Sequence, residues 1–339
     1  MRIALDCPAD GALGSFAAGA ARAAREGLEV ELVGPAEALR AELERLGLGL
    51  GGPLSIVDAP ASIAADADPT AACREKPDCS LMRAAQSVAE KRCQAFVTAA
   101  APTAAAAAAL WHLKRLRGVL KPALALPLAT ARGRTVLVDA GACLDCKPWH
   151  LLQFALIGSL YARALHAVAE PVVRLLAAGR GATMGGELAR ETLPLLKYAG
   201  VRFEGPIAAE EAFLGGSDVI VSDGLSGAVL SGAARGLSGV QFEMLESEFA
   251  GSAVLRFARR LADGPFARAR GRSRGPAAPG AALLGVGGAV VVCREPADPD
   301  AVAETLRAAK ALAESDLAAQ TQARLEDMKS GMEFARTIE

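Results

Sequence analysis

The feature that most constrains this chain is an alternation, sustained from residue 2 to about residue 320, of short apolar runs and longer stretches of helical periodicity. The apolar runs have no polar face, which is typical of strands buried on both sides of a sheet. The predicted strands are Arg2–Asp6, Glu29–Val33, Leu54–Asp58, Ala95–Ala99, Thr135–Asp139, Val172–Leu176, Asp218–Ser222 and Ala289–Cys293. The predicted helices are Gly14–Arg25, Pro35–Leu46, Leu81–Arg92, Pro148–His166, Gly185–Lys197, Leu225–Gly236 and Asp298–Ala319. This order predicts an α/β fold, a three-layer α/β/α sandwich around a mostly parallel sheet.

Residues 241–275 interrupt the alternation. They begin acidic and amphipathic, become rich in arginine, and lead into a Gly/Pro/Ala loop that ends at Gly280. This composition predicts an amphipathic helical hairpin that protrudes from a single domain spanning residues 1–320. The charged residues 321–339 predict a C-terminal tail or a loosely packed helix.

Charge and hydropathy exclude several classes of function. The net charge of −1 provides no electrostatic basis for binding nucleic acid. We find no apolar run suited to a membrane-spanning helix, and the first residues lack the features of a signal peptide. We therefore expect a cytoplasmic protein whose seven cysteines are reduced thiols.

Ligands in this fold class bind beyond the carboxyl ends of the strands. The loops to inspect therefore begin at Asp6, Ala99, Asp139, Leu176 and Asp223.

The most informative segment, residues 138–155, combines a strand end, a glycine turn and a helix with Pro148 in its first turn. Such a junction presents backbone N–H groups to an anion, and Lys147 adds a positive charge beside it. Asp139 and Asp145 are candidates to orient this lysine or to act in acid–base chemistry. The residues alone leave open a simpler alternative, a loop with a capping aspartate and a solvated lysine.

The same segment resembles a run found in the bacterial phosphate acyltransferases of phospholipid synthesis, Asp-Val-Gly-Ala-Asn-Val-Asp-Cys-Lys-Pro-Glu-His-Leu-Leu-Gln-Phe-Ala. The matching residues include Asp139, Gly141, Asp145, Cys146, Lys147, Pro148, His150, Gln153 and Phe154. Weaker similarities lie in the same order along the chain, at Asp6, at residues 217–227 and at residues 280–286.

The resemblance implies an isopropylmalate-dehydrogenase-like fold and a homodimeric enzyme of fatty acid and phospholipid metabolism. Its reaction converts acyl–acyl-carrier-protein and inorganic phosphate to acyl phosphate and free carrier protein, and it implies no metal and no organic cofactor. In this hypothesis the catalytic residues are Lys147, Asp145 and Asp139. The residues expected to bind substrate or phosphate, or to support the residues that do, are Asp6, Gly141, His150, Gln153, Asp223, Gly224 and Gly227.

Other positions depart from the family's pattern. Ala228 and Ser231 stand where the family has asparagine and lysine, and residues 98–104 replace a loop that carries Ser, Asn and Thr donors. Losing one preorganised donor typically costs about 10²–10³ in rate. Candidates to replace the lost donors are Thr103, Arg180 and Arg294.

These departures support a second hypothesis, a catalytically silent family member. Such a protein would act as the partner subunit of a related chain in a heterodimer, as a carrier-protein-binding protein or as a scaffold. A third alternative is acyl transfer to a changed acceptor or of a shorter acyl group.

Arg256, Arg259 and Arg260 lie in the arginine-rich part of the hairpin. They are interpreted as a solvated face, as a docking site for the acidic carrier protein, or as a contact with anionic lipid headgroups. In the family, this part of the chain is associated with dimerisation and with peripheral membrane contact, here at the inner face of the membrane. These arginines are therefore expected contacts for carrier protein or membrane.

Cys143 and Cys146 have the spacing of a redox pair or of half a zinc site. No second Cys/His pair of metal spacing accompanies them in the sequence, and Cys146 belongs to the family run. Incidental thiols are the favoured interpretation, with a redox role as the alternative.

Overall fold

The apolar runs assemble side by side into one sheet. The structure is a computed structural model that describes residues 1–9, 12–49, 52–63, 67–178, 186–273, 280–294 and 298–338. Within these residues the sheet has 11 strands in the order β3-β2-β1-β4-β11-β10-β5-β6-β9-β7-β8. The strands are β1 (Arg2–Asp6), β2 (Glu29–Gly34), β3 (Leu54–Asp58), β4 (Ala95–Thr98), β5 (Ala123–Ala129), β6 (Arg134–Val138), β7 (Val172–Leu176), β8 (Arg202–Ile207), β9 (Val219–Val221), β10 (Gly280–Leu284) and β11 (Ala289–Cys293).

The prediction of a mostly parallel sheet is confirmed, with three reversals at its centre. Strand β10 is antiparallel to both β11 and β5, and β5 is antiparallel to β6. The outer groups β3-β2-β1-β4-β11 and β6-β9-β7-β8 are each parallel internally, and they run in opposite directions. All of the strands that the sequence predicts are present, whereas β5, β8 and β10 were not predicted.

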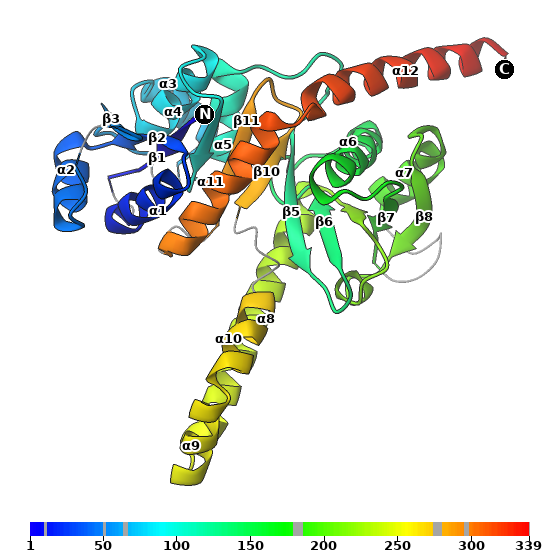
Figure 1. Cartoon of the computed structure of the whole chain (residues 1–339). Coiled ribbons are helices and arrows are strands. Elements are labelled where there is room, and N and C mark those ends of the chain that lie inside the picture. The colour runs from blue at the N-terminus through cyan, green and yellow to red at the C-terminus, as the bar shows by residue number, and fades with distance from the viewer. Residues whose placement is uncertain are drawn as a thin grey trace.

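Helices cover both faces of this sheet, as the three-layer prediction requires (Figure 1). They are α1 (Leu13–Arg25), α2 (Ala36–Arg45), α3 (Pro69–Glu75), α4 (Ser80–Ala89), α5 (Pro102–His112), α6 (Pro148–His166), α7 (Glu187–Leu195), α8 (Gly224–Ala250), α9 (Ala253–Leu261), α10 (Asp263–Ser273), α11 (Pro299–Glu314) and α12 (Leu317–Ile338), with 3₁₀ turns η1 (Leu196–Tyr198) and η2 (Glu211–Phe213).

The core divides along the faces of the sheet because successive side chains of a strand point to opposite sides. Ile3 and Leu5 of β1 join one cluster with residues of α1, α2, α6 and α11. Ala4, between them, joins a second cluster with residues of α3, α4 and α5. Strand β1 is therefore buried on both sides, which explains why its interior residues are apolar.

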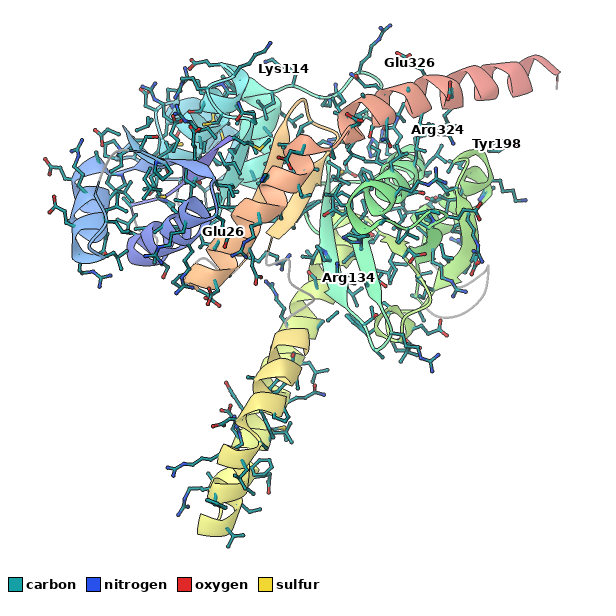
Figure 2. All side chains as sticks on the ribbon, in the orientation of Figure 1. Glu26, Lys114, Arg134, Tyr198, Arg324 and Glu326 are labelled. Carbon is teal, nitrogen blue, oxygen red and sulfur yellow. The ribbon has the colours of Figure 1, made fainter. Side chains whose placement is uncertain are left out.

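The predicted hairpin is confirmed as a long arm that leaves the body of the molecule (Figure 1). Its first helix, α8, is longer than predicted and spans 27 residues, and α9 and α10 return along it. Arg259 of α9 lies 4.2 Å from the centre of the Phe266 ring and 3.8 Å from a carboxylate oxygen of Glu246. The arm thus has internal contacts of its own, and many of its side chains project outward along its length (Figure 2).

The C-terminal region differs in detail from the prediction. The helix predicted at 298–319 is divided at Ser315, whose backbone is extended, into α11 and α12. The expected start of the tail at residue 321 falls inside α12, where Thr321 and Leu325 are buried. Over the described residues, each helix is too short or too polar to cross a membrane.

Candidate active site

Asp139 directly follows β6 and organises the loop after that strand. It is completely buried. Its Oδ1 accepts hydrogen bonds from the backbone N–H groups of Leu124, Gly141 and Ala142, at 2.7, 3.1 and 3.0 Å, and its Oδ2 accepts one from Cys143 at 2.6 Å. Burial raises the pKa of the Asp139 carboxyl, and these backbone donors oppose the rise. A buried carboxylate engaged in this way fixes the path of the loop.

The N-terminus of α8 is pressed against the same loop, and two glycines make this approach possible. A Cβ atom on Gly227 would lie 1.9 Å from the carbonyl oxygen of Asp139, and one on Gly224 would lie 2.5 Å from the carbonyl oxygen of Cys143. Asp223 caps the helix: its Oδ1 accepts from the Ser226 N–H at 2.9 Å. The predicted residues Asp223, Gly224 and Gly227 therefore seat α8 on the β6 loop.

The N-terminus of α6 carries the next group of predicted residues. His150 Nδ1 accepts a hydrogen bond from the backbone N–H of Lys147 at 3.0 Å, while the Lys147 side chain is exposed. Burial first, and then the charges of Lys121 and Lys147, lower the pKa of His150. Lys121 was not predicted from the sequence, since it precedes a strand that was itself missed. The structure thus places two cations beside this imidazole.

Gln153, one turn further along α6, is buried and bonded at both ends of its amide. Its Oε1 accepts from the Leu120 N–H at 2.8 Å, and its Nε2 donates to the Gly118 carbonyl at 2.9 Å. Gln153 therefore fixes the loop that carries Lys121 toward β5.

Asp6, at the end of β1, supports a second loop. Its Oδ2 accepts a hydrogen bond from Thr98 Oγ1 at 2.6 Å, and Thr98 Oγ1 accepts one from the backbone N–H of Ala100 at 3.0 Å. Asp6 and Thr98 are both buried. Asp6 therefore acts on the loop between β4 and α5 through the Thr98 hydroxyl.

These two loops meet at a cavity of about 350 Å³. Its described lining residues are Ala99, Ala100, Ala101, Pro102, Ala140, Gly141, Leu144, Ala228, Ser231, Arg235, Val292, Cys293 and Arg294. Of the residues predicted to catalyse or bind, Gly141 is in this lining, and its φ of +128° explains the requirement for glycine. Asp6, Asp139, Gly224 and Gly227 lie behind the wall, and Asp145 and Lys147 are exposed on the loop beyond Leu144.

Arg235 is the cavity residue that sequence reasoning missed. It lies one helical turn after Ser231 on α8, so the two residues share a face of the helix. Arg294, which the sequence suggested as a replacement donor, also lines the cavity. Thr103 lies in the first turn of α5, and Arg180 falls outside the described residues.

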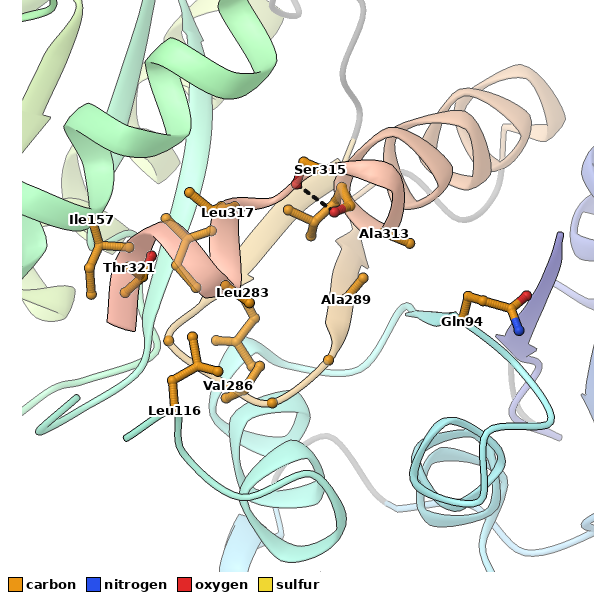
Figure 3. A pocket seen from close by; sticks show the side chains of 16 residues that line it. Gln94, Leu116, Ile157, Leu283, Val286, Ala289, Ala313, Ser315, Leu317 and Thr321 are labelled. Carbon is orange, nitrogen blue, oxygen red and sulfur yellow. Dashed lines mark hydrogen bonds between the residues drawn. The ribbon is translucent and has the colours of Figure 1, made fainter. Parts of the chain in front are cut away.

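The described residues also line further cavities. One of about 560 Å³ is mainly apolar, with Leu151, Leu175, Leu176, Leu188 and Val229 in its wall and Asp223 at its edge. Another of about 220 Å³ lies between the β10–β11 turn and the junction of α11 and α12, where Ser315 donates to the Leu312 carbonyl at 2.7 Å (Figure 3). The lining of this second cavity includes none of the predicted site residues.

The three arginines predicted as contacts for carrier protein or membrane all lie on α9. Arg259 is engaged within the arm, with Glu246, Asp263 and Phe266. Arg256 donates to the carbonyl of Ala250 at 3.0 Å. Beside these arginines and Arg260, the apolar side chains of Val254, Phe257 and Leu261 are 76%, 63% and 74% exposed.

One group of potential metal ligands occurs among the described residues. One ligand atom from each of Cys143, Cys146 and His150 lies within 4.8 Å of the others. The Nδ1 atom of His150 already accepts the Lys147 N–H, so binding a metal through this atom would break the cap of α6.

Comparisons with known proteins agree with this architecture. Residues 1–320 match the family model described as "Fatty acid synthesis protein". The chain is 36% identical over 335 residues to a phosphate acyltransferase of Elusimicrobium minutum, covering 97% of each chain. It is 40% identical over 328 residues to a phosphate acyltransferase of Thermus thermophilus, covering 96% of this chain and 98% of the relative.

Among solved structures, a phosphotransacetylase from Streptococcus pyogenes superposes with a TM-score of 0.61 at 16% identity, covering 92% of this chain and 94% of that one. A branched-chain phosphotransacylase from Enterococcus faecalis superposes with a TM-score of 0.52 at 11% identity, covering 93% and 99%. At these identities the superpositions establish the fold.

Proposed function

Because this chain belongs to the phosphate acyltransferase family of fatty acid synthesis proteins, we propose that it transfers an acyl group from acyl carrier protein to inorganic phosphate. It is a phosphate acyltransferase-like protein. The observation that carries the proposal is the cavity between the β4 and β6 loops, which has two arginines in its wall.

Phosphate binds in this cavity, in our proposal, between Arg235, Arg294 and the N-terminus of α5. Ala101 caps that helix without a side-chain hydrogen bond, and Ala100 to Pro102 line the cavity. A helix N-terminus and guanidinium groups both favour an anion. Arg235 supplies the positive charge that Ser231 lacks, because a long side chain one turn away reaches back along the same face.

The acyl chain lies in the apolar cavity of about 560 Å³ beside the N-terminus of α8. Its wall of leucine, valine and alanine side chains suits a hydrocarbon chain. Asp223, at its edge, holds the first turn of α8 between this cavity and the β6 loop.

The chemistry asked of the site is an attack by a phosphate oxygen on the thioester carbonyl carbon. The carbon–sulfur bond then breaks, and the carrier protein leaves as a thiolate. Cations that hold phosphate, and N–H donors for the developing oxyanion, lower the barrier to this step. In this proposal Lys147 and Lys121, whose charges act on His150, add positive charge near the site, and Asp145 orients Lys147. Asp6, Asp139, His150 and Gln153 hold the loops in place.

The test measures phosphate-dependent release of free carrier protein from palmitoyl–acyl-carrier-protein by mass spectrometry. Arg235→Ala and Lys147→Ala are each expected to lower kcat/KM, by roughly 10²-fold for Arg235→Ala. Arg40→Ala, on the exposed face of α2, is the matched control and is expected to have no effect. If the folded wild-type protein releases no carrier protein above background, the catalytically silent alternative replaces this proposal.

We further propose that the arm serves the protein's partners. Leu237, Val240 and Met244 of α8 are 61%, 52% and 63% exposed at helical spacing, and this stripe fits a second copy of the chain. Leu237→Glu combined with Met244→Glu is expected to convert a dimer to a monomer, as measured by light scattering.

The α9 tip, with Arg260 and the exposed Phe257, faces acyl carrier protein or an anionic membrane surface, and Phe257→Ser should reduce sedimentation with anionic vesicles.

A further inference from the structure

The β6 loop carries two cysteines, Cys143 and Cys146, whose sulfur atoms are in contact. Cys143 Sγ and Cys146 Sγ are 3.2 Å apart, and the Cys146 thiol donates toward the Cys143 sulfur. The same thiol lies 3.2 Å from the Cys143 carbonyl oxygen. The sulfurs thus already face each other across a Cys-x-x-Cys turn.

The surroundings of this pair differ from those of Cys73 and Cys93. The pair sits at the N-terminus of α8, where the Gly224 N–H donates to the Cys143 carbonyl at 3.0 Å. A helix N-terminus favours a thiolate. By contrast, Cys73 and Cys93 are buried in apolar core.

We propose that Cys143 and Cys146 form a reversible dithiol–disulfide pair, oxidised by exchange with a low-molecular-weight disulfide such as glutathione disulfide. One sulfur of the pair, as its thiolate, attacks the small disulfide, forms a mixed disulfide and releases one small thiolate. The second sulfur loses its proton to solvent, attacks the protein sulfur of the mixed disulfide and releases the second small thiolate. The pair loses two electrons and two protons, and one small disulfide becomes two thiols.

Access to the pair is provided by Cys146, which is only partly buried, whereas Cys143 is buried. A small disulfide therefore meets Cys146 first, and Cys143 lies in place as the resolving sulfur. A zinc site is the competing use of these residues, but the His150 Nδ1 is engaged with the Lys147 N–H, and the described cluster has three members where a closed structural zinc site has four.

The disulfide would form in the β6 loop, which contacts the start of α8 and leads into α6. The Cys143 N–H donates to Asp139, its carbonyl accepts from Gly224, and Cys146 directly precedes Lys147, the N-cap of α6. Oxidation therefore alters the segment that joins Gly141 of the cavity wall to Lys147.

The experiment uses the full chain, reduced and then incubated in buffers of graded glutathione disulfide to glutathione ratio. The samples are acid-quenched, alkylated and digested with trypsin. Because the Lys147–Pro148 bond resists trypsin, both cysteines stay in one peptide, residues 135–163. The expected product is this peptide two hydrogens lighter and unalkylated, restored by dithiothreitol, formed at least about tenfold faster than modification of Cys73 or Cys93.

Cys143→Ser and Cys146→Ser are each expected to abolish the lighter peptide and to leave the remaining cysteine alkylated or glutathionylated. The wild-type peptide map keeps the proposal testable if either variant fails to fold. Two outcomes would overturn the proposal: a peptide that stays fully alkylated at every glutathione ratio, or thiols that react only after a chelator has released a stoichiometric metal. Neither readout depends on acyl transfer, so the proposal stands or falls independently of the proposed function.

Discussion

The loops after β6 and β4 close on the same cavity, and each has a buried aspartate behind it, but the two aspartates hold their loops by different means. Asp139 binds backbone N–H groups of Leu124, Gly141, Ala142 and Cys143 directly. Asp6 reaches its loop only through the hydroxyl of Thr98, which accepts the Ala100 N–H. The β6 loop is therefore held by a carboxylate that accepts several backbone hydrogen bonds, and the β4 loop by one hydroxyl that links a carboxylate to one backbone N–H.

The difference corresponds to what each loop brings to the cavity. In the β6 loop, Gly141 has a left-handed φ and α8 approaches the carbonyl oxygen of Asp139, so the backbone must be held closely. The β4 loop contributes alanine side chains and the N-terminus of α5, where Pro102 is the first helical residue.

Removing the Asp139 carboxylate tests this comparison with the largest expected effect. Asp139→Ala leaves the backbone donors of the β6 loop buried without an acceptor, which we expect to destabilise the protein by about 3–5 kcal/mol. Urea unfolding followed by circular dichroism measures the loss. Asp139→Asn, which keeps one oxygen acceptor, should lose less. A change below about 1 kcal/mol for the alanine variant would show that the carboxylate does not hold the loop.

The approach of α8 to the β6 loop provides a second test. Gly227→Ala places a Cβ atom 1.9 Å from the Asp139 carbonyl oxygen, so the helix or the loop must move. We expect a loss of about 1–3 kcal/mol in unfolding free energy, the usual cost of overpacking. The control is Gly232→Ala on the same helix, where a Cβ meets nothing within 4 Å and should stabilise the protein by about 0.5–1 kcal/mol. Equal effects at the two positions would contradict the close approach.

Much of the sheet could be predicted from the sequence, because apolar runs without a polar face need burial on both sides. The strands that were missed have specific reasons: β5 is rich in alanine and contains Pro127, and β8 contains Pro206 and a glycine. Helix α5 was missed for a related reason, since its alanine run has no amphipathic pattern. Antiparallel pairing at the centre leaves no local trace, because pairing partners are chosen by distant parts of the chain.

The candidate site was predictable in position more than in role. The run from Asp139 to Gln153 identified the loop. From the sequence alone, however, its residues could be interpreted either as catalytic groups or as solvated groups. The structure shows that Asp139, His150 and Gln153 hold backbone. Arg235 carries no motif, and its place in the cavity depends on how α8 leaves the sheet, which spacing alone does not reveal.

The relay behind the β4 loop gives the third test, with a smaller expected effect. Thr98→Val keeps the volume of the side chain but removes the hydroxyl that joins Asp6 to the Ala100 N–H. We expect a loss of about 1–3 kcal/mol, below that of Asp139→Ala, because fewer buried groups lose a partner. Thr98→Ser restores the hydroxyl and should recover most of the loss. If Thr98→Val were as damaging as Asp139→Ala, the relay would be as strong as the direct clamp.

The helices that follow the two loops differ in their caps, which predicts a small dependence on pH. Helix α6 begins with the His150 Nδ1 accepting the Lys147 N–H, whereas α5 begins at Ala101 with no side-chain cap. Burial and the nearby lysines lower the pKa of His150, so the folded protein keeps its imidazole neutral where the unfolded chain, with a pKa of about 6.5, binds a proton. The stability due to this cap is therefore complete above about pH 6.5 and is lost as the pH falls toward the lower folded-state pKa.

His150→Asn isolates this effect, because asparagine offers an acceptor to the Lys147 N–H and does not titrate. The unfolding free energy is measured at about pH 7.5 and at about pH 5.5 for both proteins. Between these two pH values it should fall by up to about 1 kcal/mol more in the wild type than in the variant. His166 and His112, whose pKa values burial also lowers, contribute equally to both proteins and cancel in the difference. If the variant kept the full acid sensitivity, the pH dependence would belong to those residues, and the α6 cap would be as indifferent to pH as the uncapped start of α5.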